Sequence, residues 1–363
     1  MGSIIIGDDL ELVDNVHVEI DENGKIDHIG KGFLDGAKEL RGGIALPPLV
    51  NYHAHTADFV SPEYGGDRPI REVVGDPFSI KYKVFKEYNV EKGIYKFLKF
   101  SEETGVGAVI DFREEGVDGI LKGIGIKGKT TVKHIMLGRT DNRRPSADEL
   151  KELAELSDGI GVPSANYYEE DMLKTIRSIF NSKLRSVHIS ETLRQSLRND
   201  LEYVMKNLDP SFIVHGTNLS EKELEELAKS QIPLVMCPRS NLWFSVGVPK
   251  VASAIRLGVK LLFGTDNGGI ISPNMWREME VAALIARAQD PSMNDGKAIL
   301  KAASVNGYGL VRLHPIEEGS LADFMIIDGE FNGISRAINK YMAIVKRTDK
   351  ILHRVIGEKF LSF

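Results

Sequence analysis

The chain has 363 residues, of which 42% are hydrophobic and 27% charged, as is ordinary for a globular protein with a large core. Its net charge of −6, without a block of like charges, argues against nucleic acid or a membrane surface as a partner. One cysteine excludes a disulfide framework and a cysteine-based zinc site. The sequence contains neither a basic, apolar leader nor the roughly 20 consecutive apolar residues of a membrane span, so we expect a cytoplasmic protein.

Both ends of the chain have the pattern of short β-strands. Near the N-terminus, "VHVEIDENGKIDHIG" predicts a hairpin that turns at Glu22-Asn23-Gly24. Near the C-terminus, the runs "ADFMIIDG", "YMAIVKRTD" and "ILHRVIGEKF" are typical of strands separated by turn residues. We therefore expect residues 1–48 and 315–363 to combine into a small β-sandwich domain.

Between these ends, apolar runs alternate with helical patterns. The strand candidates are "IALPPLV", "GAVIDFRE", "VKHIMLGR", "GIGVPSAN", "LRSVHISE", "FIVHGTN", "IPLVMCPRS" and "VKLLFGTDN". The helical patterns include "SEKELEELAKS", where Ser220 and Glu223 form a predicted capping box. Such alternation indicates an α/β fold with a parallel sheet. Eight units over residues 49–314 favour a (β/α)₈ TIM barrel, which needs about 250 residues, over a doubly wound open sheet.

Polar residues follow several predicted strands at the end where a barrel carries its chemistry. They are His53 and His55 on the first strand, His188 and Glu191 on the fifth, His215 on the sixth and Asp266 on the eighth. Because residues i and i+2 of a strand point to the same side, both histidines of the first strand can face the barrel axis. Three or four nitrogen and oxygen ligands with an open position suit a catalytic zinc or iron ion.

Each of these residues also has a simpler explanation. A single buried histidine is more often structural than a metal ligand, and Asp266 could cap the next helix. These explanations would have to hold together at the same end of four different strands. The combination therefore favours a metal site.

Several motifs resemble those of a known family. "LPPLVNYHAHTADF" is similar to the "PGFINTHTH" opening of the amidohydrolase superfamily. "SVHISET", "IVHGTNLSEKELEELAKSQIPLVMCPRSNL" and "GVKLLFGTDN" resemble the later motifs of its mononuclear metal-dependent deaminase branch, which includes cytosine- and adenosine-type deaminases and chlorohydrolase relatives. The tail "EEGSLADFMIID" resembles the return of that family into a β-sandwich, so the likeness extends from about residue 3 to 360.

The resemblance implies the following roles. His53, His55, His188 and Asp266 would be ligands of one divalent metal ion, zinc or else iron. Glu191 would transfer protons, His215 would position the attacking water, and Asp266 would also act as a base. The fourth strand, "GIGVPSAN", has no counterpart of the bridging lysine of binuclear members, which supports a single ion. The implied reaction is hydrolytic deamination of an aminated heterocycle or amidine.

Two other functions stay open. One is hydrolysis of a cyclic or linear amide, or of another C–X bond, at the same site. The other is a catalytically silent relative with a structural or binding role, although the presence of all six site residues argues against it. We expect a small-molecule substrate, and a homo-oligomer is compatible with the sequence.

Six residues just past strands two, three, seven and eight are candidates for the substrate pocket. They are Arg113, Arg139, Arg239, Asn241, Trp243 and Trp276. For each of them a surface salt bridge or a packing role is an equal alternative. The arginines point to an anionic group on the substrate. The segments "GVPSANYY" and "SNLWFSVG" depart from the pattern of deaminases that act on adenosine-like thioethers.

Overall fold

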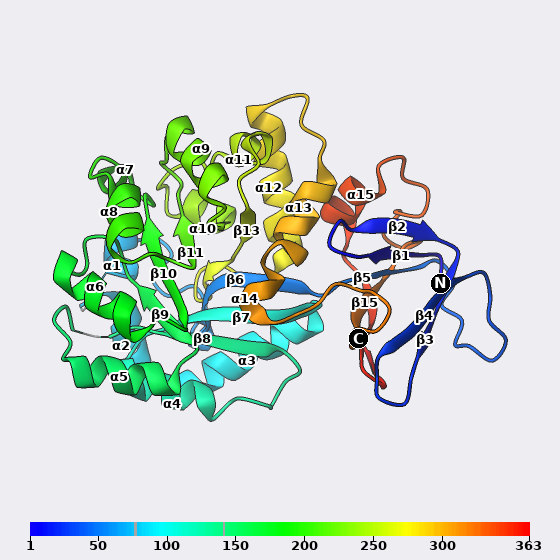
Figure 1. Cartoon of the computed structure of the whole chain (residues 1–363), viewed down its shortest axis with the longest axis horizontal. Helices are drawn as coiled ribbons and strands as arrows, with labels where there is room; N and C mark the ends of the chain where they lie inside the picture. The colour runs from blue at the N-terminus through cyan, green and yellow to red at the C-terminus, as the bar shows by residue number, and fades with distance from the viewer. Residues whose placement is uncertain (76–77, 141) are drawn as a thin grey trace.

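The computed structural model describes residues 1–75, 78–140 and 142–363 of the chain. It contains a large α/β part, formed by the middle of the chain, and a smaller β-rich part (Figure 1). Both chain termini lie in the β-rich part. Among the described residues, every helix is too short or too polar to cross a membrane.

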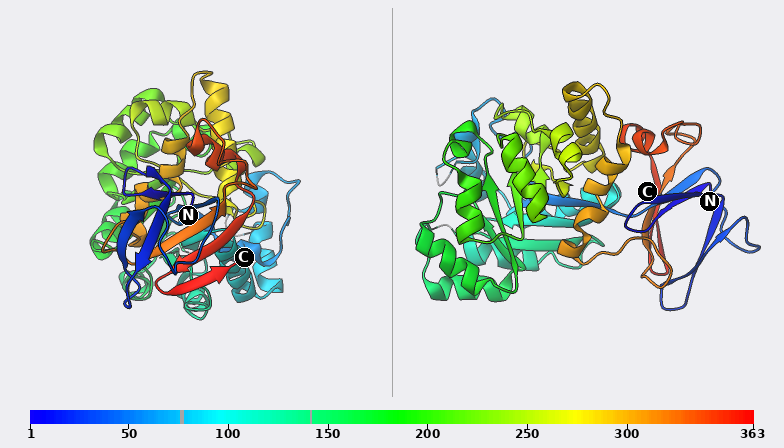
Figure 2. Two further views of the ribbon diagram at one scale, coloured as in Figure 1. Left: turned by 90° about the vertical axis from the view of Figure 1, so that its right-hand side faces the viewer. Right: turned by 45° about the horizontal axis from the view of Figure 1, so that its top comes forward.

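The β-rich part contains a six-stranded sheet with strands from both ends of the chain, in the order β17-β16-β15-β5-β1-β2. The strands are β1 (Ser3–Ile6), β2 (Glu11–Asp14), β5 (Gly43–Leu46), β15 (Asp323–Asp328), β16 (Ile351–Ile356) and β17 (Lys359–Ser362). All its pairs are antiparallel except β1–β5. Figure 2 shows the N-terminal and C-terminal strands side by side in this part.

The predicted N-terminal hairpin is confirmed as β3 (Val16–Ile20) and β4 (Ile26–Lys31). At its turn, Asp21 Oδ1 accepts from the backbone N–H of Asn23 and of Lys25, and Gly24 has a φ of +75° that favours glycine. An apolar cluster joins the hairpin to the six-stranded sheet. It includes Val16 and Ile26 from the hairpin and Ile4, Ala45 and Phe324 from the sheet.

One prediction for the C-terminal region was wrong. The run "YMAIVKRTD" forms helix α15 (Lys340–Arg347) instead of a strand. Asn339 caps this helix by accepting from the N–H of Met342, and Ala343 and Ile344 are buried where α15 packs on the helices of the larger part. Tertiary packing here outweighs the weak β-propensity of the isoleucine and valine.

The larger part is a curled parallel sheet of nine strands, in the order β13-β12-β11-β10-β9-β8-β7-β6-β14. The strands are β6 (Leu49–His55), β7 (Val106–Arg113), β8 (Lys133–Gly138), β9 (Gly159–Val162), β10 (Leu184–Ile189), β11 (Phe212–His215), β12 (Leu234–Met236), β13 (Leu261–Phe263) and β14 (Asp266–Asn267). Only Gly264 and Thr265 separate β13, which pairs with β12, from β14, which pairs with β6. This topology is consistent with a TIM-type α/β fold.

Helices connect and cover these strands. They are α1 (Ile70–Val73), α2 (Ile80–Glu87), α3 (Val90–Glu103), α4 (Gly116–Ile124), α5 (Ala147–Leu156), α6 (Glu170–Ile179), α7 (Leu193–Ser196), α8 (Asp200–Asn207), α9 (Glu221–Ser230), α10 (Pro238–Trp243), α11 (Val251–Leu257), α12 (Met275–Gln289), α13 (Gly296–Ala302) and α14 (Tyr308–Val311), with the 3₁₀ turns η1 (Thr56–Val60) and η2 (Val305–Gly307). The capping box predicted at Ser220 and Glu223 opens α9.

The first barrel strand differs from its prediction. "IALPPLV" is not one strand, because Pro47 and Pro48 lack the N–H groups that a sheet needs. The residues before this pair belong to β5 of the six-stranded sheet, and those after it begin β6 of the parallel sheet. His53 and His55 lie at the end of β6, on the strand where they were predicted.

Candidate active site

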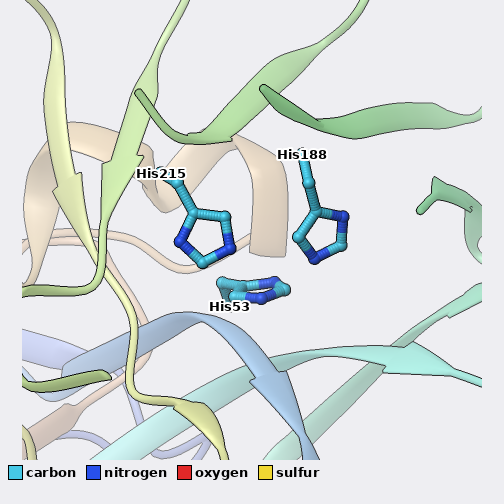
Figure 3. A group of neighbouring side chains, drawn as sticks. All are labelled: His53, His188 and His215. Carbon is cyan, nitrogen blue, oxygen red and sulfur yellow. The ribbon is translucent and has the colours of Figure 1, made fainter. Parts of the chain in front are cut away.

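Histidine side chains from three strands of the parallel sheet converge at one point. Figure 3 shows the rings of His53 (β6), His188 (β10) and His215 (β11) turned toward one another. Their centroids lie 4.8 Å (His53–His188), 5.5 Å (His53–His215) and 5.2 Å (His188–His215) apart. His55 follows His53 by two residues on the same strand, and its ring centroid lies 5.0 Å from that of His53. All four histidines are buried.

Asp266 on β14 completes the cluster. Its Oδ1 lies 3.1 Å from His53 Nε2 and 3.5 Å from His55 Nε2. Gly264 permits this close approach, because a Cβ at that position would lie 2.7 Å from backbone atoms of His53. Three sets of three potential metal-ligating groups lie at this point, each with ligand atoms within 4.8 Å of one another. They are His53, His188 and His215; His53, His55 and Asp266; and Glu191, His215 and Asp266.

Hydrogen bonds on the far side of two rings fix their orientation. His188 Nδ1 lies 3.0 Å from the carbonyl oxygen of Val162, and His55 Nδ1 lies 2.7 Å from Glu114 Oε1. Because both acceptors lack a proton, each Nδ1 donates, which leaves Nε2 of the neutral ring as the atom available to a metal ion. Such partners are typical of metal-ligating histidines.

The charge states also suit a cation. Burial lowers the pKa of His53 and of His215 to about 4, and it holds the pKa of His188 well below its ordinary value. These rings are therefore neutral at pH 7, the form that ligates metal. Among the residues that the structure describes, buried His53 Nδ1 has no hydrogen-bond partner. This buried set of imidazoles and a carboxylate fits a zinc-type ion.

The two carboxyl groups of the site differ in protonation. Burial, and then the Asp266 carboxylate, raise the pKa of Glu191 to about 8, so Glu191 carries a proton at neutral pH. Burial also tends to raise the pKa of Asp266, but the hydrogen bond with His53 and the neighbouring imidazoles hold it well below its usual range. Ser240 Oγ donates to Asp266 Oδ2 at 2.5 Å. The site therefore contains one proton donor and one anionic base.

The backbone is strained at three positions of this site. Ser190, His215 and Asp266 have φ values of +44°, +72° and +61°, in the left-handed region that favours glycine. At Ser190 the chain turns out of β10, and Asp200 holds the turn by accepting from the N–H and the Oγ of this residue at 2.5 and 2.6 Å. The turn brings Glu191 Oε1 to 3.7 Å from His215 Nε2. A continued strand would have turned Glu191 away.

A second buried network, which the sequence analysis missed, supports His55. Glu114, directly after β7, forms a salt bridge with Lys81 of α2, and Lys81 Nζ lies 3.0 Å from Asp58 Oδ2 in η1. Arg113 Nη2 donates to Glu114 Oε2 at 3.4 Å. All four charged side chains are at most 2% exposed. Glu114 is the last residue of the second predicted strand, "GAVIDFRE", and Asp58 lies within the motif "LPPLVNYHAHTADF", so both could have been noticed. Lys81 lies in a segment without a clear period.

A cavity of about 230 Å³ opens onto the site. Its walls include His55, His188, Glu191, His215 and Asp266, together with the cations Lys81 and Arg139. The six predicted site residues, His53, His55, His188, Glu191, His215 and Asp266, thus lie together at or directly beneath this cavity.

Of the six predicted pocket residues, Arg139 is the one that lines this cavity. Arg113 is fully buried beneath it and pairs with Glu114, and Asn241 Nδ2 lies 3.2 Å from His215 Nδ1. Arg239 donates to the carbonyl oxygens of Ser272 and Asn274.

The two tryptophans lie outside the cavity lining. Trp243 is 52% exposed. Trp276 donates to the carbonyl oxygen of Thr104 and lines a different cavity.

The chain is similar in sequence to a family of known proteins. The model of the amidohydrolase family matches residues 44–356. The chain is 31% identical to an uncharacterized protein of Methanocaldococcus jannaschii, over 88% of each chain. It is 25% identical to the 5-methylthioadenosine/S-adenosylhomocysteine deaminase of Thermococcus sibiricus, over 90% of this chain and 84% of that protein.

The fold resembles that of solved structures. The atrazine chlorohydrolase of Arthrobacter aurescens, complexed with zinc, superposes with a TM-score of 0.79 at 14% identity, over 99% of this chain and 93% of that one. The extent of the family match, from β5 to the end of β16, covers the whole parallel sheet with its histidine cluster. The chain belongs to the amidohydrolase family.

Proposed function

We propose that this chain is a metal-dependent hydrolase that deaminates a compact aminated heterocycle or amidine. The observation that carries the proposal is the buried cluster of four histidines and Asp266, with protonated Glu191 beside it, at the floor of a cavity. The Thermococcus relative, by its name a deaminase, supports the reaction type. The cavity of about 230 Å³ is smaller than the roughly 300–1,000 Å³ of sites for drug-sized ligands, which favours a compact substrate.

In this proposal, His53, His55, His188 and Asp266 hold one divalent ion, preferably zinc, with iron as the alternative. The zinc in the structurally similar chlorohydrolase supports this choice. A divalent ion in such a donor set supplies Lewis acidity that makes water a nucleophile at neutral pH. We also propose that β13 and β14 are two halves of one eighth strand, so that the sheet closes as a (β/α)₈ barrel spanning residues 49–314. Residues 1–48 and 315–363 would then form the small β-sandwich domain.

The side chains of the protein move the protons. Anionic Asp266 accepts a proton from the attacking water as its oxygen bonds to the sp² carbon that bears the amino group. Protonated Glu191 donates to the ring or amidine nitrogen. The proton held by Asp266 then passes to the amino group, which makes it a leaving group, and the now anionic Glu191 takes the proton of the new hydroxyl group. The C–N bond then breaks, ammonia departs, and a carbonyl group remains. His215, whose Nε2 lies 3.7 Å from Glu191 Oε1, positions the water.

The test is ammonia release by zinc-loaded protein over a panel of aminated purines, pyrimidines, their nucleosides and amidines. We expect ammonia from at least one member and none after removal of the metal with a chelator. Amides and chlorinated triazines belong in the same panel, because hydrolysis of an amide or another C–X bond is the second candidate function on this scaffold. Turnover of these compounds alone would replace the deaminase proposal. A folded protein that retains no metal and turns over nothing would support a silent relative.

A further inference from the structure

A second group of histidines lies on the β3–β4 hairpin, outside the candidate active site. In the hairpin register, His17 pairs with Gly30 and Glu19 pairs with His28. Because alternate residues of a strand share a face, these four residues form one block on one face of the hairpin. The other face, which carries Val16, packs into the apolar cluster of the small domain.

The potential ligand atoms of this block converge. One ring nitrogen each of His17 and His28 and one carboxylate oxygen of Glu19 lie within 4.8 Å of one another, and His17 Nε2 lies 3.6 Å from Glu19 Oε1. Tetrahedral zinc with bonds of about 2.1 Å requires ligand atoms about 3.4 Å apart. Small side-chain rotations therefore suffice to close the set around an ion.

Gly30 makes room for both rings. A Cβ at this position would lie 2.3 Å from His17 Nε2 and 3.1 Å from His28 Nε2. Both nitrogens thus lie above the Gly30 backbone, where a larger residue would separate them.

Each ring is oriented from its far side. His17 Nδ1 lies 3.1 Å from the carbonyl oxygen of Gly32, and His28 Nδ1 lies 2.8 Å from Glu318 Oε1. Glu318 is itself fixed by the backbone N–H of Ile29, which donates to the same oxygen at 2.8 Å. In neutral rings both Nδ1 atoms therefore donate and both Nε2 atoms carry lone pairs, and that of His17 lies 3.6 Å from Glu19 Oε1. A carbonyl or carboxylate behind the ring, as found for both histidines, is typical of metal ligands.

We propose that His17, Glu19 and His28 form a second divalent-metal site of the zinc class, which ties β3 to β4. Two imidazoles and one carboxylate suit zinc and its neighbours in the transition series rather than calcium or magnesium, which prefer oxygen ligands. The site is independent of the proposed catalytic function, since none of its residues lines the cavity at the active site.

The test is a titration of the full-length, chelator-treated protein with zinc alone, followed by calorimetry. We expect two zinc ions per chain for the wild type and one for His17→Ala and for His28→Ala. His314→Ala, which removes an exposed histidine outside the block, serves as the matched control and should still bind two. Glu19→Gln changes one half-buried carboxylate and should weaken the second site at least tenfold.

Measurements of enzymatic activity distinguish the proposed hairpin metal site from the proposed catalytic site. The variants of the hairpin site should keep the turnover of the wild type on any substrate found. Equal zinc stoichiometry in wild type and His28→Ala, with both proteins folded by circular dichroism, would overturn the proposal. The Gly30→Ala variant provides a second route, because its Cβ displaces the His17 ring while both histidines remain, and undiminished zinc binding would also contradict the site.

Discussion

Glu114 provides the sharpest test of the candidate metal centre, because it contacts a proposed ligand without being one. Its Oε1 accepts from His55 Nδ1 at 2.7 Å and so fixes the ring with Nε2 toward Asp266. Replacing Glu114 by Gln keeps the shape and one acceptor oxygen but removes the charge. Loss of such a partner lowers metal affinity about 10- to 100-fold, which corresponds to about 1.4–2.7 kcal/mol. We expect the Gln variant near the lower limit, since its amide oxygen can still accept.

The same substitution also disturbs the charge balance. Glu114 faces Lys81 as well as Arg113, and removing one member of a buried ion pair costs about 3–5 kcal/mol of stability. A second variant separates the two effects. Glu114→Gln combined with Arg113→Met removes one charge of each sign, while Lys81 stays paired with Asp58 and Asp111 keeps its hydrogen bonds with Thr56 and His134. We therefore expect this double variant to regain stability while its zinc affinity stays low.

The assay is zinc competition against a chromophoric chelator, in a His28→Ala background so that one site titrates, together with urea unfolding. Glu102→Gln is the matched control. Glu102 is a buried carboxylate that accepts from Thr131 and pairs with Lys99, and it does not line the active-site cavity. This control should lose stability and keep its zinc affinity. The reasoning fails if Glu114→Gln binds zinc like the wild type, or if the double variant recovers affinity together with stability.

Two further predictions concern other carboxyl groups. Glu191→Gln should retain zinc but lose about 10²- to 10⁴-fold in kcat, because the amide cannot transfer a proton; unchanged turnover would remove Glu191 from the mechanism. Asp111 is buried, but Arg113, His134 and Thr56 outweigh the burial and hold its pKa at about 2, below the ordinary value of 3.8. The Asp111 carboxylate therefore stabilises the folded protein above pH 3.8, and this contribution is lost as the pH falls toward 2. Between pH 6 and pH 3 the free energy of unfolding of the wild type should fall by about 1 kcal/mol more than that of Asp111→Asn. Urea unfolding over this pH range measures the difference, and parallel profiles for the two proteins would contradict the assignment.

The residues of the candidate site could be predicted mainly from local sequence patterns. Alternation along a strand put His53 and His55 on one side, and parallel strands brought His188, His215 and Asp266 to the same end of the sheet. These features depend on spacing within a few residues and on a general rule of barrel architecture.

The supporting network was not predictable in this way. Lys81 and Asp58 lie between β6 and β7, in a segment without a clear period, and their partner Glu114 follows β7. Pairing between them depends on how that segment folds over the sheet, which no spacing in the sequence encodes. The same limit explains the wrong prediction for "YMAIVKRTD", where contacts with distant helices decide between strand and helix.

The strained backbone links the fold to the proposed function. Left-handed φ values at non-glycine residues cost about 1–3 kcal/mol each and persist only where the surroundings enforce them. Here they occur at Ser190 just after β10, at His215 at the end of β11 and at Asp266 at the start of β14, each beside or within the histidine cluster. At Ser190 the enforcing group is the buried carboxylate of Asp200, which accepts twice from this one residue. A chain selected only for stability would relax such turns by placing glycine there. The chain instead keeps side chains at these strained positions, because they place Glu191, His215 and Asp266 in the site. This favours a catalytic over a purely structural role.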